Sequence, residues 1–138
     1  QGSARNGLDA VPDTADVILI HDAARPLAGL DVYHRVIDAV LDGAAAVVPV
    51  VPVVDTIRAV DGRVVDRDTL RAVQTPQGFG AGPLREAHAR GGEATDDAAL
   101  VADLGHDVVL VEGDLRSLKV TRPVDIAFIT ALLEDSEA

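Results

Sequence analysis

The sequence has no cysteine, methionine or tryptophan, and only one tyrosine and two phenylalanines. Without cysteine, the chain can form no disulfide, no thiolate metal site and no cysteine nucleophile. Hydrophobic residues still make up 48% of the chain, so a core must be built from alanine, valine, leucine and isoleucine. No apolar run approaches the roughly 18–20 residues of a membrane span, and no basic leader opens the chain. We therefore expect no membrane association and a cytoplasmic location.

Positive charge is also scarce. The 138 residues, the length of a single domain, carry 12 basic against 23 acidic side chains, for a formal net charge of −11. Such a chain repels nucleic acid and anionic lipid, so we expect neither as a partner. A phosphorylated substrate would have to be held by individual basic side chains, of which Lys119 is the only lysine.

Apolar residues alternate between continuous runs and helical spacing. The runs at 17–20 and 44–51 predict strands buried on both faces, and 71–73 and 108–111 predict shorter ones. Steps of three and four predict a helix over 30–41. Further helices are expected at 3–11, at 83–90, behind a capping Thr95, and at 123–133. This order predicts an α/β domain with a mostly parallel sheet and helices on both faces.

Residues 49–70 interrupt that order. Apolar and polar residues alternate on both sides of Asp61-Gly62, a strong signal for a hairpin turn. A two-stranded ribbon is only marginally stable by itself, so we expect this one to pack on something, such as a second copy of the chain. After it, residues 75–78 are interpreted as a loop.

Two charged segments follow predicted strands, where open α/β sheets bind their ligands. Directly behind 17–20, Asp22 could bind a ribose hydroxyl or a metal-bound phosphate, and Arg25 could bind a phosphate. Lys119 precedes a predicted helix start, which is a sensible phosphate site. Each residue also has an ordinary explanation: a capping aspartate in a turn, a surface arginine and a lysine at a sheet edge. Position alone leaves these alternatives open.

Together these segments resemble the 2-C-methyl-D-erythritol 4-phosphate cytidylyltransferase family. The motifs lie at the family's spacing and span essentially the whole chain. They are residues 1–3 and 7–8, VILIHDAARP at 17–26, PVVPVVDTI at 49–57, LRAVQTPQGF at 70–79, TDDA at 95–98 and LKVTRP at 118–123.

The resemblance implies a three-layer, Rossmann-like nucleotidyltransferase fold in which 49–70 is a dimerisation arm of a homodimer. It implies transfer of a cytidylyl group from CTP to 2-C-methyl-D-erythritol 4-phosphate, a polyol phosphate, in non-mevalonate isoprenoid biosynthesis. Mg²⁺ is implied as the cofactor, bound mainly through the CTP phosphates and near Asp22, with no metal site made by the protein alone.

The resemblance also implies roles for individual residues. Lys119 and Arg67 match catalytic residues, and Arg67 would reach a partner's site across the dimer. The residues that match substrate-binding positions are Asp22, Arg25, Thr56, Thr75 and Ser3. Of these, Ser3 matches a serine near the cytosine.

The family's first region, with its glycine-rich CTP loop, has no counterpart in this sequence. We therefore expect 1–138 to be a single partial domain, incomplete at the N-terminus and inactive by itself. Two alternatives stay open. One is a ribitol-5-phosphate cytidylyltransferase, with the same fold, nucleotide and arm. The other is a non-catalytic dimerisation and substrate-binding half.

Overall fold

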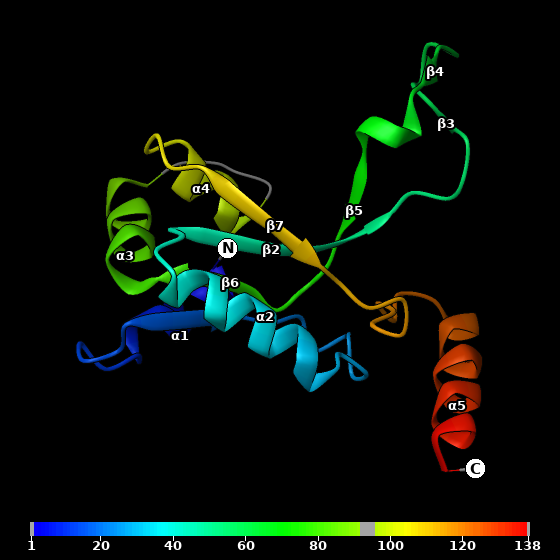
Figure 1. Ribbon diagram of the computed structural model, residues 1–138, viewed down its shortest axis with the longest axis horizontal. Helices are drawn as coiled ribbons and strands as arrows, with labels where there is room; N and C mark the ends of the chain where they lie inside the picture. The colour runs from blue at the N-terminus through cyan, green and yellow to red at the C-terminus, as the bar shows by residue number, and fades with distance from the viewer. Residues whose placement is uncertain (1, 92–95, 138) are drawn as a thin grey trace.

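A mixed five-stranded sheet forms the centre of the computed structural model, which describes residues 2–91 and 96–137 (Figure 1). Its strands are β1 (Val17–Ile20), β2 (Ala46–Pro52), β5 (Arg71–Val73), β6 (Gln77–Gly80) and β7 (Val108–Glu112). β1, β6 and β2 are neighbours in that order, and β7 pairs with the opposite edge of β2. β5 shares the edge of β2 that β6 occupies, farther along the strand.

Strand β6 runs against the two strands beside it. β2 and β7 are parallel, with Ala46 opposite Val108, whereas β6 is antiparallel to both β1 and β2. β1, β2 and β7 therefore share one direction, as the predicted α/β fold requires. The prediction of a loop over 75–78 is wrong for residues 77 and 78, which belong to β6. This strand lies between β1 and β2 in the sheet.

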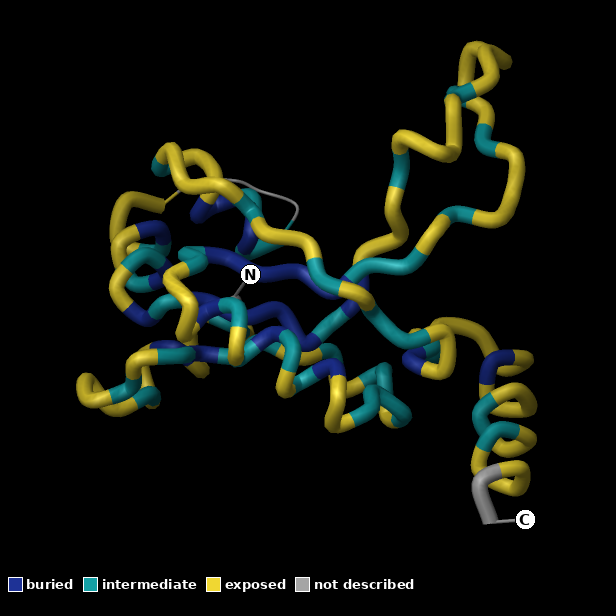
Figure 2. The backbone as a smooth tube through the Cα atoms, in the orientation of Figure 1, coloured by how far each residue is buried: buried dark blue, intermediate teal, exposed yellow. Residues whose placement is uncertain are grey.

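Helices cover both faces of this sheet, which confirms the predicted three layers. These helices are α1 (Gly2–Asp9), α2 (Leu30–Leu41), α3 (Ala81–Arg90) and α4 (Asp97–Ala102). Side-chain alternation along β2 divides the core: Val47 packs with α2, whereas Ala46 and Val48 pack in a second cluster with Leu84. That second cluster contains residues of α1, α3 and α4. Figure 2 shows the buried backbone gathered in the sheet between these layers.

Close packing explains why a sequence that does not favour a strand forms β6. Gln-Gly-Phe-Gly contains two glycines and no β-branched residue. A Cβ at Gly78 would lie 2.3 Å from Cγ1 of Val36, so only glycine lets α2 approach this closely. Phe79 is fully buried, and burial of such a side chain contributes about 1.5–3 kcal/mol. Tertiary packing, not local propensity, determines this strand.

Two helix starts differ from the predicted ones. α3 begins at Ala81, before the predicted start at Pro83. At α4, the predicted cap Thr95 lies outside the described residues, and the side chain of Asp96 accepts a hydrogen bond from the backbone N–H of Ala99 at 2.9 Å. Asp96 is therefore the N-cap of α4, because its carboxylate satisfies an N–H that has no partner within the helix.

The hairpin predicted within 49–70 projects away from the sheet (Figure 1). β5 and β2 form its base, and β3 (Ile57–Arg58) pairs with β4 (Val64–Val65) near its tip. The turn falls at Asp61-Gly62, as predicted. Val54, Val60 and Val64 are exposed along it. Apolar side chains gathered on a projection are typical of a surface that binds another molecule.

The last helix, α5 (Pro123–Glu137), stands apart from the sheet (Figure 1). Asp125 in its first turn accepts hydrogen bonds from the N–H groups of Thr121 and Arg122 at 2.9 and 2.8 Å. These bonds fix the segment that leads from β7 into the helix. Among the described residues, no helix has the length and apolar character to cross a bilayer.

Candidate functional site

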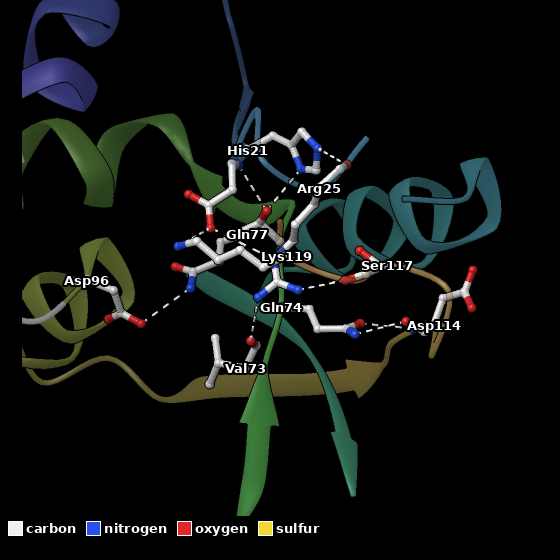
Figure 3. Close-up of polar contacts among 11 residues, drawn as sticks. His21, Arg25, Val73, Gln74, Gln77, Asp96, Asp114, Ser117 and Lys119 are labelled. Atoms are coloured by element: carbon white, nitrogen blue, oxygen red, sulfur yellow. Dashed lines mark hydrogen bonds and ion pairs between the residues drawn. The ribbon is translucent and has the colours of Figure 1, made fainter. Parts of the chain in front are cut away.

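Three segments that are distant in sequence meet at the end of β1. They are the 21–26 loop after β1, the 74–76 bend between β5 and β6, and the 113–122 loop after β7. Nζ of Lys119 lies 3.0 Å from Oδ2 of Asp22, and the N–H of Val120 donates to the carbonyl of Ala24 at 2.8 Å. Figure 3 shows the side chains of His21, Arg25 and Lys119 converging from two of these segments. The predicted residues Asp22, Arg25, Thr75 and Lys119 are thus brought together.

Asp22 is held through its backbone as well as its carboxylate. Its N–H donates to Oγ1 of Thr75 at 3.0 Å, and that oxygen also lies 3.0 Å from Nδ1 of His21. Nε2 of His21 lies 3.1 Å from the carbonyl of Arg25. Since a carbonyl only accepts, Nε2 must carry a proton. In the neutral form of His21, Nδ1 then has no proton and accepts the hydrogen bond from the Thr75 hydroxyl. Because that hydroxyl also accepts from the N–H of Asp22, it can only accept one further hydrogen bond from a ligand.

Arg25 connects the loop after β1 with the loop after β7 and with the end of β5. Its Nη1 donates to the carbonyl of Ser117 at 2.6 Å and its Nη2 to the carbonyl of Val73 at 3.2 Å. Its Nε lies 3.8 Å from Oδ2 of Asp22, and only 12% of its side chain is exposed. Burial lowers the pKa of Arg25, and the charge of Asp22 opposes this shift. Arg25 therefore supports the site with two hydrogen bonds to the backbone and places its charge beside Asp22.

These residues line a cleft of about 320 Å³. Its lining residues are Ile20, Asp22, Arg25, Val73, Gln74, Thr75, Gln77, Asp96, Asp97 and Lys119. The cleft thus combines two cations with carboxylates and neutral amide and hydroxyl groups. Such a set of side chains can bind a phosphate through the cations and sugar or polyol hydroxyls through the carboxylates and the hydroxyl.

A second cleft, of about 480 Å³, shares Asp22 and Asp97 with the first and extends towards α1. The predicted residue Ser3 lines it, together with His21. Ser3 therefore lines a cleft that Asp22 shares with the cleft of Lys119.

Asp96 and Asp97 form the wall of the first cleft opposite the 113–122 loop. Nε2 of Gln77 donates to Oδ2 of Asp96 at 3.3 Å, so the N-cap of α4 is tied to β6. Nε2 of His88 lies 2.8 Å from Oδ1 of Asp97, and both side chains are largely buried. Both carboxylates thus have partners within the fold.

The predicted residues Thr56 and Arg67 lie on the arm, outside both clefts. Both are exposed, and Nη1 of Arg67 donates to the carbonyl of Val54 across the arm. Their contribution to a site across a dimer stays a prediction.

The structure adds Gln74, Gln77 and Ser117 to this site, none of which the sequence analysis singled out. Gln74 and Gln77 are 6% exposed, and Ser117 is 1% exposed. The signal for the two glutamines was present, since both flank Pro76 in a polar segment directly behind a predicted strand. The signal for Ser117 was not, because it acts through its backbone carbonyl.

Asp22 is an accessible carboxylate that could take part in holding Mg²⁺. Within 2–91 and 96–137, no three histidine, aspartate or glutamate side chains gather as a metal site. Mg²⁺ in phosphate chemistry is commonly held by one or two carboxylates together with substrate phosphates. Asp22, 40% exposed and lining both clefts, can supply one such ligand.

Comparison with known proteins places this site within one family. The family model for 2-C-methyl-D-erythritol 4-phosphate cytidylyltransferase matches residues 1–135. A curated protein of that name from Streptomyces avermitilis is 46% identical, over 96% of this chain and 58% of its own length. One from Frankia casuarinae is 51% identical, over 95% of this chain and 52% of its own length. The chain thus spans about half the length of the curated relatives it matches.

A solved structure agrees with the sequence comparison. The crystal structure of 2-C-methyl-D-erythritol 4-phosphate cytidylyltransferase from Thermus thermophilus has a TM-score of 0.86 and 44% identity to this chain. The match covers 94% of this chain and 66% of that one. On the family model, the relatives and this fold, the chain belongs to the 2-C-methyl-D-erythritol 4-phosphate cytidylyltransferase family.

Proposed function

We propose that the complete protein carrying this chain transfers a cytidylyl group from CTP to 2-C-methyl-D-erythritol 4-phosphate in the non-mevalonate pathway to isoprenoids. In this reaction an oxygen of the substrate phosphate attacks the α-phosphorus of CTP. The bond from that phosphorus to the bridging oxygen of the β-phosphate breaks, and pyrophosphate leaves with the electron pair. The products are the CDP-alcohol and pyrophosphate. Membership of the family supports this proposal.

The single observation that carries the proposal is the pair formed by Lys119 and Asp22 at the end of β1. A lysine ammonium has three donors, and Asp22 uses one of them, so Lys119 can still donate to a phosphate. Asp22 can accept hydrogen bonds from hydroxyls of the polyol or the ribose. Phosphoryl transfer depends mainly on positioning and on neutralising charge at phosphorus, which a fixed ammonium group provides.

The proposed roles of the remaining residues follow their positions. Thr75 would accept a hydrogen bond from a substrate hydroxyl, and Ser3 would lie near the cytosine in the second cleft. Arg25 would add positive potential to the phosphate site. Asp22 would hold Mg²⁺ jointly with CTP phosphates. When bound, Mg²⁺ neutralises phosphate charge and favours departure of pyrophosphate.

The proposal includes a cytoplasmic homodimer whose 49–70 arm carries Thr56 and Arg67 into the partner's site. The exposed valines of the arm and its projection from the sheet support this part of the proposal. A projecting ribbon gains stability when a partner covers its apolar surface.

The test is CTP-dependent pyrophosphate release by the longest reading frame that contains this sequence. Methylerythritol 4-phosphate and ribitol 5-phosphate are compared as acceptors, with CTP alone as the control. Preference for methylerythritol 4-phosphate is the expected result. Preference for ribitol 5-phosphate would show that the acceptor of the cytidylyl group is ribitol 5-phosphate. Absence of pyrophosphate release with either acceptor would favour a binding module without catalysis.

A further inference from the structure

The side chain of Gln74 forms a two-bond clamp on the loop that carries Lys119. Its Nε2 donates to the carbonyl of Asp114 at 2.8 Å, and its Oε1 accepts from the N–H of Asp114 at 3.0 Å. Figure 3 shows these two bonds side by side. The side-chain amide thus replaces the peptide group with which Asp114 would pair in a strand. Exchange of its oxygen and nitrogen would set like groups against each other, so the orientation of the amide is fixed.

The clamp sits beside the middle of β2 and is connected to both edges of that strand. The N–H of Gln74 donates to the carbonyl of Pro49 at 2.8 Å, and the N–H of Gly113 donates to the carbonyl of Val50 at 2.9 Å. Gln74 follows β5, at the base of the arm, and Gly113 follows β7 on the opposite edge. The side chain of Gln74 therefore links two segments that β2 separates.

Gly113 is the residue that makes this link possible. A Cβ at Gly113 would lie 2.3 Å from Oε1 of Gln74 and 3.1 Å from the carbonyl oxygen of Val50. Gln74 is only 6% exposed, so water cannot easily replace its two bonds. The close approach and the burial show that the loop is held tightly at this point.

Downstream of the clamp, the same loop supports the candidate site. Ser117 offers its carbonyl to Arg25, and Lys119 pairs with Asp22 at 3.0 Å. Both partners lie in the 21–26 loop. The ion pair is half-exposed, and pairs of that kind hold a side chain only weakly. The buried clamp therefore restrains the start of the 113–122 loop, and the bonds that Ser117 and Val120 make to the 21–26 loop restrain it nearer Lys119.

We propose that Gln74 is a positioning residue that holds the loop bearing Lys119 in the geometry needed for the substrate phosphate. The catalytic consequence rests on the proposed function, whereas the restraint on Lys119 rests only on the contacts above. A change at Gln74 therefore loosens the loop that bears Lys119, and because Gln74 also lines the first cleft, the position of Lys119 has to be measured apart from activity.

The first measurement is the rate at which an amine-reactive acylating reagent modifies Lys119 in the folded, complete protein, quantified by peptide mass spectrometry. Gln74→Ala removes both bonds, and we expect it to raise that rate about threefold to tenfold, as for the loss of one or two hydrogen bonds. Gln74→Glu keeps the size and the acceptor but sets a carboxylate oxygen against the carbonyl of Asp114, so we expect a rise at least as large. If Gln74→Ala does not fold, the acylation rate of Lys119 in Gln74→Glu tests the proposal.

Val40→Ala is the matched control, because Val40 is a buried core residue on α2 and contacts neither the clamp nor the cleft. It lowers the stability of the fold without loosening the loop, so Lys119 should react as in the wild type. Unchanged acylation in both Gln74 variants, or an equal rise in Val40→Ala, would overturn the proposal.

Kinetics give the second measurement. Gln74→Ala should lower kcat for pyrophosphate release more than it raises KM for CTP, and Gln74→Glu should do the same. A complete protein with no cytidylyl transfer would refute the proposed function and still leave the acylation test of the clamp valid. Faster acylation with unchanged kcat would show that the clamp does not position Lys119 for catalysis.

Discussion

Nζ of Lys119 lies 3.0 Å from Oδ2 of Asp22, joining the loops that follow β7 and β1. The two side chains are 47% and 40% exposed, so water screens their attraction and the pair contributes little to stability. What the pair brings to the site is an ammonium group beside a carboxylate, with donors left for a ligand. We therefore expect the loss of Lys119 to affect activity much more than stability.

Lys119→Ala in the complete protein should lower the rate of cytidylyl transfer by about 10²–10³, the effect of losing one preorganised donor at the reacting phosphate. Its free energy of unfolding should change by less than about 1 kcal/mol. Steady-state pyrophosphate release and urea unfolding measure the two effects. Arg90→Ala is the control, because Arg90 pairs with Glu86 on the surface and is not among the described residues that line the two clefts. Wild-type kinetics in Lys119→Ala would remove this residue from the mechanism.

Arg67→Glu should reduce activity strongly while the fold is retained, if the arm completes a partner's site. Activity is measured by pyrophosphate release and the fold by thermal unfolding. Arg63→Glu makes the same charge change near the tip of the hairpin, where Arg63 faces Asp61 at 3.9 Å, and should be nearly silent.

Mixing variants tests whether the site is shared. In a heterodimer of Arg67→Glu with Lys119→Ala, one site combines an intact Lys119 with an intact Arg67, and the other site has neither. Random exchange should restore about a quarter of the wild-type sites, since half of the dimers are heterodimers with one good site each. No gain of activity after exchange has been verified would argue against the shared site.

Most of the fold follows from local patterns in the sequence. The helix over 30–41 and the strand over 17–20 appear at the predicted residues, because their periodicity and composition favour those structures. Strand β6 (Gln77–Gly80) could not be predicted from its own sequence. It depends on the close packing of Gly78 against Val36 of α2. That contact depends on tertiary structure.

The candidate site divides in the same way. Asp22 and Lys119 were identifiable as charged residues behind predicted strands, although their 3.0 Å contact depends on the strand order. Ser117 was not, and neither was the contact of Gln74 with Asp114, because both involve backbone groups of remote segments. A side chain that binds a carbonyl leaves no spacing pattern between the two residues.

Asp125 makes the stability of the start of α5 depend on pH. Hydrogen bonds from the N–H groups of Thr121 and Arg122 lower the pKa of Asp125 below its ordinary value of 3.8. Near that pH the unfolded chain binds more protons than the native one, so this contribution is complete above pH 3.8 and is lost as pH falls through the native pKa. Asp125→Asn should therefore destabilise the protein most at neutral pH, and the difference should shrink below pH 3.8.

Urea unfolding of the wild type and Asp125→Asn from pH 7 to about pH 2.5 measures this difference. Asp31→Asn is the control: Arg35 lowers the pKa of Asp31 through an exposed contact, so its effect should be smaller at every pH. A destabilisation by Asp125→Asn that does not vary with pH would contradict the assigned role of the carboxylate.

Gly78 and Gly82 offer a matched pair of glycine substitutions that tests the packing of β6 against α2. Gly78→Ala would place a methyl group 2.3 Å from Cγ1 of Val36 and should destabilise the fold by about 1–3 kcal/mol. A Cβ at Gly82, in α3, meets no atom within 4 Å, so Gly82→Ala should be neutral or stabilise by about 0.5 kcal/mol. Adding Val36→Ala to Gly78→Ala should recover part of the loss, because it removes the clashing methyl groups. If the changes in the free energy of unfolding caused by the two substitutions add strictly, the side chains at positions 78 and 36 do not interact, and the assigned packing would be wrong.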